Sequence, residues 1–287
     1  MKVLMNNELI DRKEAKVDID DRGYQFGDGI YEVIRVYQSK MFTLKQHLDR
    51  LYHSAEKIDL TIPYSQAKLT TMLEELISVN HLATGTVYLQ FSRGTQTPRN
   101  HIYKADLTAN LVSYTTEKVR DPKEFRKGIA TITVFDERWF HCDIKSLNLL
   151  GNLMATNQAA KSGAEEGIFY RSSEEVTECS HSNVSIIKDG ILITHPADCL
   201  ILNGITRQTI LKVAKQHNIP VEERPFSLAE LKTADEVFIS SVSKEITAVA
   251  KVDDVVIGNG EIGPICEKLL TYYAEEIEND CGIKLKE

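Results

Sequence analysis

The chain has 287 residues, 42% of them hydrophobic and 26% charged, which is ordinary for a globular protein of one large domain or two smaller ones. Its net charge of −8 argues against non-specific binding to nucleic acid or to acidic membrane surfaces. The five scattered cysteines form no C-x-x-C pair, which favours reduced thiols in a cytoplasmic protein. The N-terminal stretch "MKVLMNNELIDRKEAK" predicts no signal peptide, and no apolar run is long enough for a membrane span.

The N-terminal part of the chain alternates short β-branched runs with helical patterns. Two apolar runs flank Asn6-Asn7, and this arrangement predicts a β-hairpin. Apolar residues then recur at helical spacing from Leu44 to Ile58. The predicted strands are 3–5, 8–10, 30–37, 41–43 and 86–92, and the predicted helices are 44–58 and 65–80.

The charged stretch 115–123 ends in Asp121-Pro122 and is the best candidate for a linker. It predicts a small N-terminal α/β domain, residues 1–118, and a larger C-terminal domain, residues 119–287. Beyond it the predicted strands are 130–134, 167–170, 184–187, 191–194 and 236–240, and the predicted helices are 148–161, 206–217 and 263–278. Because no strict βαβ repeat appears, the pattern favours an α+β fold.

Lys145 lies in "RWFHCDIKSLNLLGN", a stretch unlike a solvated basic patch. A lysine is nucleophilic only as the free amine, so catalysis requires burial or a nearby cation to lower its pKa from about 10.4. Trp139 and Phe140 could supply an apolar wall, whereas Asp143 works against this interpretation. On these residues alone, an ordinary surface lysine remains the alternative.

Two N-terminal motifs carry glycines or basic residues in unusual patterns. "DRGYQFGDGIYE" fits neither the dinucleotide fingerprint nor the P-loop, and indicates either a turn before a strand or a close approach of backbone to a ligand. In "FSRGTQTPRNH", Arg99 and His101 could face one side and bind a carboxylate. A solvated basic loop is the alternative for the second motif.

Three C-terminal motifs could bind parts of one cofactor. Glu178, in "EVTECSHSNVS", could pair with a heteroaromatic nitrogen or form part of a turn. Gly204 and Thr206 begin a predicted helix whose N–H groups could hold a phosphate, although Thr is also a good N-cap. "ISSVSKEIT" could add donors after a strand. With a Schiff-base lysine, these groups make up the parts of a pyridoxal phosphate site.

The motifs "DRGYQFGDGIYE", "RGTQTPRNH", "CDIKSLNLLGN", "VTECSHSNVSIIKDG" and "LNGITRQ" together resemble the D-amino-acid aminotransferases of fold type IV. The resemblance extends over about residues 2–280, with the order and spacing of the motifs kept. It implies a two-domain α+β fold with pyridoxal 5′-phosphate between the domains. It also implies a homodimer in which each subunit completes the other's site.

The resemblance assigns roles residue by residue. Lys145 would hold the cofactor covalently and move the proton between the substrate Cα and the cofactor C4′. Glu178 would accept a hydrogen bond from the ring N–H, and Leu202 would lie behind the ring. The phosphate would be held by Arg50, Ile205, Thr206, Ser241 and Val242. The substrate carboxylate would be held by Tyr31, Arg99 and His101, the last two from the partner subunit.

The implied reaction is a ping-pong transamination that moves the amino group of D-alanine and other D-amino acids to 2-oxoglutarate, giving a 2-oxo acid and D-glutamate. The family alternatives are an aminodeoxychorismate lyase and a branched-chain L-amino-acid aminotransferase, and the Arg99 and His101 pair favours the D-specific enzyme. A non-catalytic pyridoxal phosphate carrier is the alternative of another class. Phe140, His141 and His181 depart from the usual residues of the family, and Val242 stands where threonine is frequent.

Overall fold

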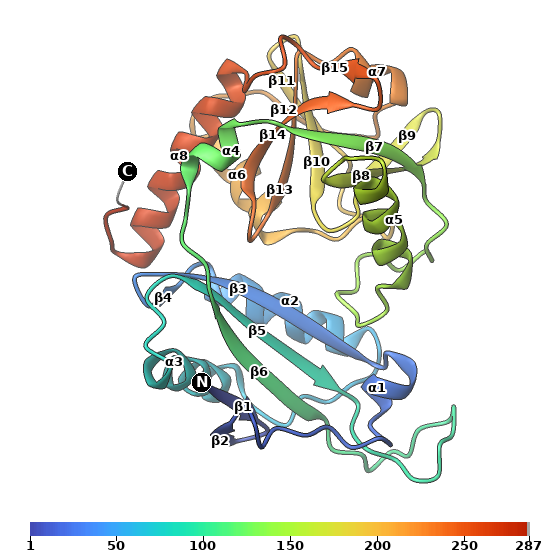
Figure 1. Cartoon of the computed structure of the whole chain (residues 1–287), viewed down its shortest axis with the longest axis vertical. Helices are drawn as coiled ribbons and strands as arrows, with labels where there is room; N and C mark the ends of the chain where they lie inside the picture. The colour runs from blue at the N-terminus through green and yellow to red at the C-terminus, as the bar shows by residue number, and fades with distance from the viewer. Residues whose placement is uncertain (286–287) are drawn as a thin grey trace. The chain divides into compact units, whose positions relative to one another are not determined.

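The computed structural model describes residues 1–285, and these divide into two compact units (Figure 1). Unit 1 comprises Met1–Arg120 together with the segment Ile144–Asn148, and unit 2 comprises Asp121–Asp143 and the chain from Leu149 onward. Within the described residues, no helix is both long and apolar enough to cross a bilayer. Because Ile144–Asn148 belongs to unit 1, the segment that carries Lys145 packs with residues that are far from it in the sequence.

Unit 1 is a six-stranded sheet, in the order β2-β1-β6-β5-β3-β4, with one face covered by α2 and α3. The helices bury apolar residues at helical spacing, such as Leu48 and Leu51, against alternate strand residues such as Ile30 and Ile34. Its elements are β1 Lys2–Met5, β2 Glu8–Asp11, α1 Arg22–Phe26, β3 Gly29–Tyr37, β4 Lys40–Met41, α2 Leu44–Glu56, α3 Gln66–Val79, β5 Gly85–Ser92 and β6 Asn110–Glu117.

Unit 2 is built on a nine-stranded mixed sheet whose main path is β12-β11-β10-β13-β14-β7-β8-β9, with β15 paired to β14. Helices α6 and α8 pack together and against β13, and α5 packs on β8. Its elements are α4 Pro122–Arg126, β7 Ile129–Phe135, α5 Leu150–Lys161, β8 Glu166–Ser172, β9 Glu175–Cys179, β10 Asn183–Lys188, β11 Ile191–Thr194, α6 Ile205–Gln216, β12 Val221–Glu223, α7 Leu228–Lys232, β13 Glu236–Ser241, β14 Glu245–Val252, β15 Val255–Val256 and α8 Pro264–Cys281.

The predicted α+β class is confirmed, and so are most of the strongly patterned elements. The hairpin has the expected two-residue turn, with Met5 opposite Glu8 and Asn6 in the left-handed region at φ 54°. Ser65 accepts a hydrogen bond from Lys68 N at the start of α3, which is the cap that the sequence indicated.

The structure differs from the sequence-based expectations in several elements, and some elements, β6 among them, were not predicted. The stretch predicted as a linker begins as strand, because β6 continues to Glu117 with Thr115 paired to Val87. The glycine-rich stretch, which indicated either a turn before a strand or a close approach to a ligand, contains the helix α1, which Asp21 caps and which Gly27 ends at φ 66°. Strand β14 was not predicted from its local residue pattern. Its pairing with β13 and β7 stabilises the extended conformation.

Candidate active site

Lys145 is held against strand β3 by backbone hydrogen bonds. Strand β4 pairs only with the C-terminal end of β3, so the edge at Gly29–Tyr31 is open to the segment Ile144–Asn148. There Tyr31 N donates to Lys145 O at 3.0 Å, and Leu147 N donates to Gly29 O at 3.0 Å. Lys145 N also donates to Ser54 Oγ on α2 at 3.2 Å. A short antiparallel bridge therefore fixes the backbone at the predicted reactive lysine.

The Lys145 side chain is half-buried, with Nζ 4.2 Å from the centroid of the Tyr31 ring. Tyr31 itself stacks on Tyr88 at 5.7 Å. Two of the predicted site residues, Lys145 and Tyr31, are thus brought into contact within unit 1.

A second cluster in unit 1 places the predicted phosphate-binding Arg50 beside a buried acid that sequence reasoning missed. Arg50 Nε and Nη2 donate to the two oxygens of Glu32 at 2.7 and 2.9 Å, and His47 Nδ1 lies 2.8 Å from Glu32 Oε2. Burial raises the pKa of Glu32, but the Arg50 charge and the His47 contact outweigh it and lower that pKa to about 2. Glu32 interrupts an apolar face between Ile30 and Ile34, and that interruption was the available signal.

Arg99 and His101 lie in the exposed loop that follows β5, and both contact Phe26 of α1. The Arg99 guanidinium is 4.2 Å from the Phe26 ring centroid, and the His101 ring centroid is 5.3 Å from it. The two predicted carboxylate-binding residues therefore both contact the aromatic ring of Phe26.

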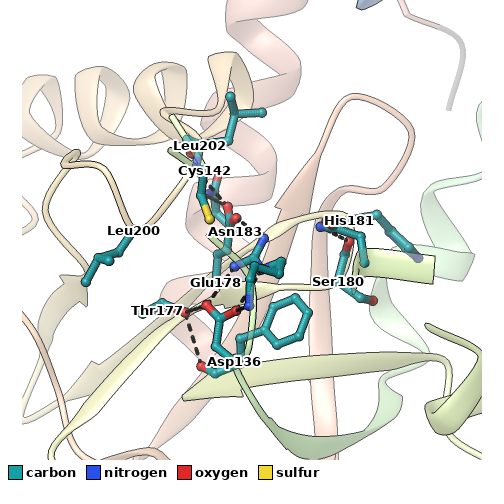
Figure 2. Close-up of polar contacts among 12 residues, drawn as sticks. Asp136, Cys142, Thr177, Glu178, Ser180, His181, Asn183, Leu200 and Leu202 are labelled. Atoms are coloured by element: carbon teal, nitrogen blue, oxygen red, sulfur yellow. Dashed lines mark hydrogen bonds and ion pairs between the residues drawn. The ribbon is translucent and has the colours of Figure 1, made fainter. Parts of the chain in front are cut away.

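In unit 2, Glu178 lies at the end of β9 and is buried in a network of hydrogen bonds (Figure 2). Arg138 Nη1 donates to Glu178 Oε1 at 2.8 Å, and Leu202 N donates to Glu178 Oε2 at 2.9 Å. Asn183 Nδ2 is 3.4 Å from the same Oε2 and donates to Leu202 O at 2.8 Å. The network fixes both oxygens of the carboxylate and ties it to the predicted residue Leu202.

Burial raises the pKa of Glu178 to about 7, although the Arg138 charge and its hydrogen bond oppose that shift. Arg138 is itself held by Asp136, which accepts from its Nε at 2.9 Å and its Nη2 at 3.0 Å. Sequence reasoning missed Arg138, Asp136 and Asn183, because only the fold brings their three segments together. A buried carboxylate with a raised pKa is well suited to accept a cationic N–H donor, which stabilises its charged form.

Helix α6 begins at Ile205, and its N-cap is Gly204, which has no side chain with which to cap the helix. Thr206 is the second helical residue and is buried, so it is not the N-cap that the alternative reading of the sequence proposed. A Cβ on Gly204 would lie 2.1 Å from Asn183 Oδ1, so the close approach of the two segments requires glycine. The helix start thus lies next to the Glu178 network through Asn183.

Ser241 ends β13, and Val242 follows it in the turn before β14. The hydroxyls of Ser240 and Ser241 are buried, and neither has a hydrogen-bond partner among the described residues. Unsatisfied buried hydroxyls are costly and indicate a missing ligand or water. A phosphate would accept from the Ser241 hydroxyl, which lies on the opposite face of β13 from that of Ser240. It would also accept from the N–H groups of a helix start, so the donor set of unit 2 fits pyridoxal phosphate.

The departures from the family pattern occupy defined places in unit 2. Phe140 is exposed, and its ring centroid lies 4.4 Å from the Arg171 guanidinium. The His141 and Trp139 ring centroids are 5.3 Å apart. His181 N donates to the buried Glu166 at 2.9 Å, and its Nδ1 lies 3.2 Å from the same oxygen (Figure 2 shows His181 beside Ser180). Burial raises the pKa of Glu166, and the His181 charge opposes that shift.

The chain is similar to known aminotransferases. The chain is 55% identical over 284 residues to a D-alanine aminotransferase of Listeria monocytogenes serotype 4b (strain F2365), with 98% of each chain covered. It is 44% identical over 279 residues to a D-alanine aminotransferase of Staphylococcus aureus (strain N315), covering 97% of this chain and 98% of the relative.

Among solved structures, the branched-chain amino acid aminotransferase of Escherichia coli matches with a TM-score of 0.90 at 25% identity, covering all of this chain and 96% of that one. A putative 4-amino-4-deoxychorismate lyase of Legionella pneumophila matches with a TM-score of 0.83 at 25% identity, covering 92% and 97%. The predicted fold type is confirmed by these matches. The family model for amino-transferase class IV matches residues 29–252. The chain therefore belongs to the class IV aminotransferase family.

Proposed function

We propose that this chain is a pyridoxal phosphate-dependent D-amino-acid transaminase that moves the amino group of D-alanine to 2-oxoglutarate. The observation that carries the proposal is identity of 44–55% over nearly the whole chain to relatives named D-alanine aminotransferase. The solved branched-chain aminotransferases and the lyase share the fold at 24–28% identity. The D-specific reaction is therefore favoured over both alternatives.

When bound, pyridoxal phosphate supplies an electrophilic carbon and a ring that withdraws electrons from the substrate Cα. Glu178, whose two oxygens are fixed by Arg138 and Leu202, would accept the ring N–H. Lys145 would hold the cofactor covalently between turnovers, and its Nζ would remove the proton from the substrate Cα.

The remaining proposed residues bind the two anionic ends of the reactants. Arg50, Ile205, Thr206, Ser241 and Val242 bind the phosphate through the guanidinium, the helix start and the turn after β13. Tyr31, Arg99 and His101 bind the substrate carboxylate. In this proposal the functional domains are residues 1–118 and 119–287, and limited proteolysis at residues 118–121 would test that boundary.

The decisive experiment incubates the purified protein and pyridoxal phosphate with D-alanine and 2-oxoglutarate and separates the products by chiral chromatography. We expect pyruvate and D-glutamate, and no product from L-alanine. L-Leucine as the amino donor tests for a branched-chain aminotransferase, and pyruvate release from aminodeoxychorismate without any 2-oxo acid tests for a lyase. A visible spectrum that D-alanine leaves unchanged would indicate a non-catalytic carrier and would refute the proposal.

The proposal also includes a homodimer in the cytoplasm. Both features are implied by the resemblance, in which Arg99 and His101 act in the partner's site. Light scattering of the purified protein tests the assembly, and a mass equal to one chain would refute the dimer. Fractionation of the source cells tests the compartment.

A further inference from the structure

The loop that carries Arg99 and His101 has little secondary structure of its own. It follows β5, and its residues 97–103 are exposed. Gln96 supports the two ends of the loop, since its side chain donates to Ile102 O at 3.0 Å and accepts from Lys104 N at 2.9 Å. Neither bond touches the backbone at the two basic residues themselves, so another group must set their direction.

That group is Arg22, a buried arginine at the start of α1. Arg22 Nη1 donates to Asn100 O at 2.6 Å, and Nη2 donates to His101 O at 3.1 Å. Its Nε donates to Asp28 Oδ2 at 2.8 Å, which fixes the guanidinium plane. A planar fork that is held at one corner presents its other two nitrogens in fixed directions, and lysine cannot reproduce this.

Helix α1 supports the side chains of the loop as well as its backbone. The Phe26 ring centroid lies 4.2 Å from the guanidinium of Arg99, 4.8 Å from that of Arg22 and 5.3 Å from the His101 ring centroid. Asp21 caps the helix through Gly23 N, so Arg22 and Phe26 keep their spacing on one short rigid turn. Figure 1 shows α1 immediately before β3, close to the loop that leaves β5.

A purely structural role for Arg22 would be to neutralise Asp28, but Asp28 has a second partner. Arg93 Nε lies 3.0 Å from each oxygen of Asp28. The Nη atoms of Arg93 donate elsewhere, to Asp59 O at 2.8 Å and Ile58 O at 2.6 Å. Loss of Arg22 would therefore leave Asp28 paired, and the contacts peculiar to Arg22 are those to Asn100 and His101.

We propose that Arg22 is a positioning residue for substrate carboxylate recognition, which sets the direction of Arg99 and His101 by holding the carbonyls of Asn100 and His101. The inference rests on the proposed function, because it deepens the role of those two residues. The glycine-rich motif "DRGYQFGDG" thereby gains a purpose, namely to fold a short helix whose Arg22 and Phe26 support the substrate-binding loop.

The test compares Arg22→Met with Arg93→Met, which removes the other arginine on Asp28 without touching the carbonyls of Asn100 and His101. For Arg22→Met we expect KM for both D-alanine and 2-oxoglutarate to rise about tenfold while kcat at saturation stays within about twofold. Arg93→Met should leave both KM values within about twofold of the parent, although its guanidinium also contacts the Tyr103 ring at 4.0 Å. Equal effects of the two variants would overturn the proposal in favour of a general role of the Asp28 network.

A second readout does not depend on activity. Trypsin cleavage at the Arg99–Asn100 bond, followed by mass spectrometry, should be faster in Arg22→Met than in the parent and in Arg93→Met. Arg22→Lys keeps a charge at Asp28 and should fold, yet it should still show faster cleavage, because one ammonium cannot replace the three donors. Unchanged cleavage in folded Arg22 variants would overturn the inference. Absence of D-glutamate with the parent protein would overturn the proposed function instead.

Discussion

Arg138 Nη1 donates a hydrogen bond to Glu178 Oε1 at 2.8 Å, while the same guanidinium binds both oxygens of Asp136. Both members of the pair are buried within unit 2. Arg138 thus lowers the pKa of a carboxyl group that burial would otherwise raise further. In the proposed roles, Glu178 binds the ring nitrogen of the cofactor and Arg138 does not touch the cofactor. Arg138 nevertheless favours the ionised form of Glu178 that this role requires.

Arg138→Met should weaken pyridoxal phosphate binding by about tenfold or more, because the pKa of Glu178 would rise above about 7 and its ionised fraction would fall. The difference in cofactor affinity between parent and variant should narrow as the pH is raised, since the Glu178 carboxyl group then ionises even without the Arg138 charge. Titration of the cofactor followed by absorbance measures the affinity. Arg171→Met is the matched control, because Arg171 lies 3.3 Å from Asp136 Oδ2 but its Nη2 donates to the carbonyls of Arg138 and Trp139 and not to Glu178. Equal affinity of parent and Arg138→Met would contradict the role of the pair.

Lys145→Ala should abolish transamination while the protein stays folded, since the half-buried side chain contributes little packing. Borohydride treatment should fix pyridoxal phosphate to the Lys145 peptide of the parent and to no peptide of the variant, as read by mass spectrometry. Lys161→Ala, at the end of α5, serves as the control and should be labelled as the parent is. Turnover near the parent rate in Lys145→Ala would remove Lys145 from the mechanism.

Gly204→Ala should reduce both stability and cofactor affinity, because the new Cβ would meet Asn183 Oδ1 at 2.1 Å. Overpacking of this kind costs about 1–3 kcal/mol, and here it would also displace the amide that binds Leu202 and approaches Glu178. Urea unfolding and cofactor titration measure the two effects. Combining Gly204→Ala with Asn183→Ala should recover part of the lost stability, and strict additivity of the two changes would argue against the clash.

Glu32→Gln should lower the free energy of unfolding by about 3 kcal/mol at neutral pH, because the Arg50 guanidinium would lose the negative charge that accepts hydrogen bonds from its Nε and Nη2. The pKa of Glu32 is lowered from 4.5 to about 2, so its stabilisation is present above about pH 4.5 and is lost as the pH falls through 2. The difference between parent and variant should therefore shrink on acidification, which urea unfolding at several pH values would reveal. Glu56→Gln, on an exposed residue at the end of α2, should change stability little at any pH.

His181→Ser should change the free energy of unfolding by less than about 1 kcal/mol, because the imidazole is half-exposed and the backbone N–H of residue 181 and the Ser182 hydroxyl still bind Glu166. The pKa of Glu166 should rise, since the opposing charge is removed. Any difference should disappear below about pH 4.5, where the carboxyl group is protonated in both folded and unfolded chains. A large loss of stability or of turnover would show that the departure at His181 is essential.

The sequence was sufficient to predict the elements whose pattern is local. The period of apolar residues in α2 and the Asn6-Asn7 turn depend on neighbours along the chain, and both were predicted. Strand β14 was missed because it depends on pairing with β7 and β13. Helix α1 was missed because it is only five residues long and depends on the Asp21 cap. Strand β6 was also not predicted, and its last residues lie in the charged stretch predicted as a linker, where Thr115 and Glu117 pair with β5.

The candidate residues were predicted chiefly by the order and spacing of motifs, which a single sequence displays directly. The tertiary structure alone decided which side chains form hydrogen bonds and ion pairs with these candidate residues. Arg138 and Glu178 are 40 positions apart, and Arg22 and Asn100 are 78 positions apart, so no local pattern relates them. Ion pairs and hydrogen bonds of this kind act over a few ångströms in space, whereas a sequence orders residues only along the chain. The sequence by itself was enough to predict which residues are reactive, and the fold determined which side chains contact those residues, bury them and shift their pKa values.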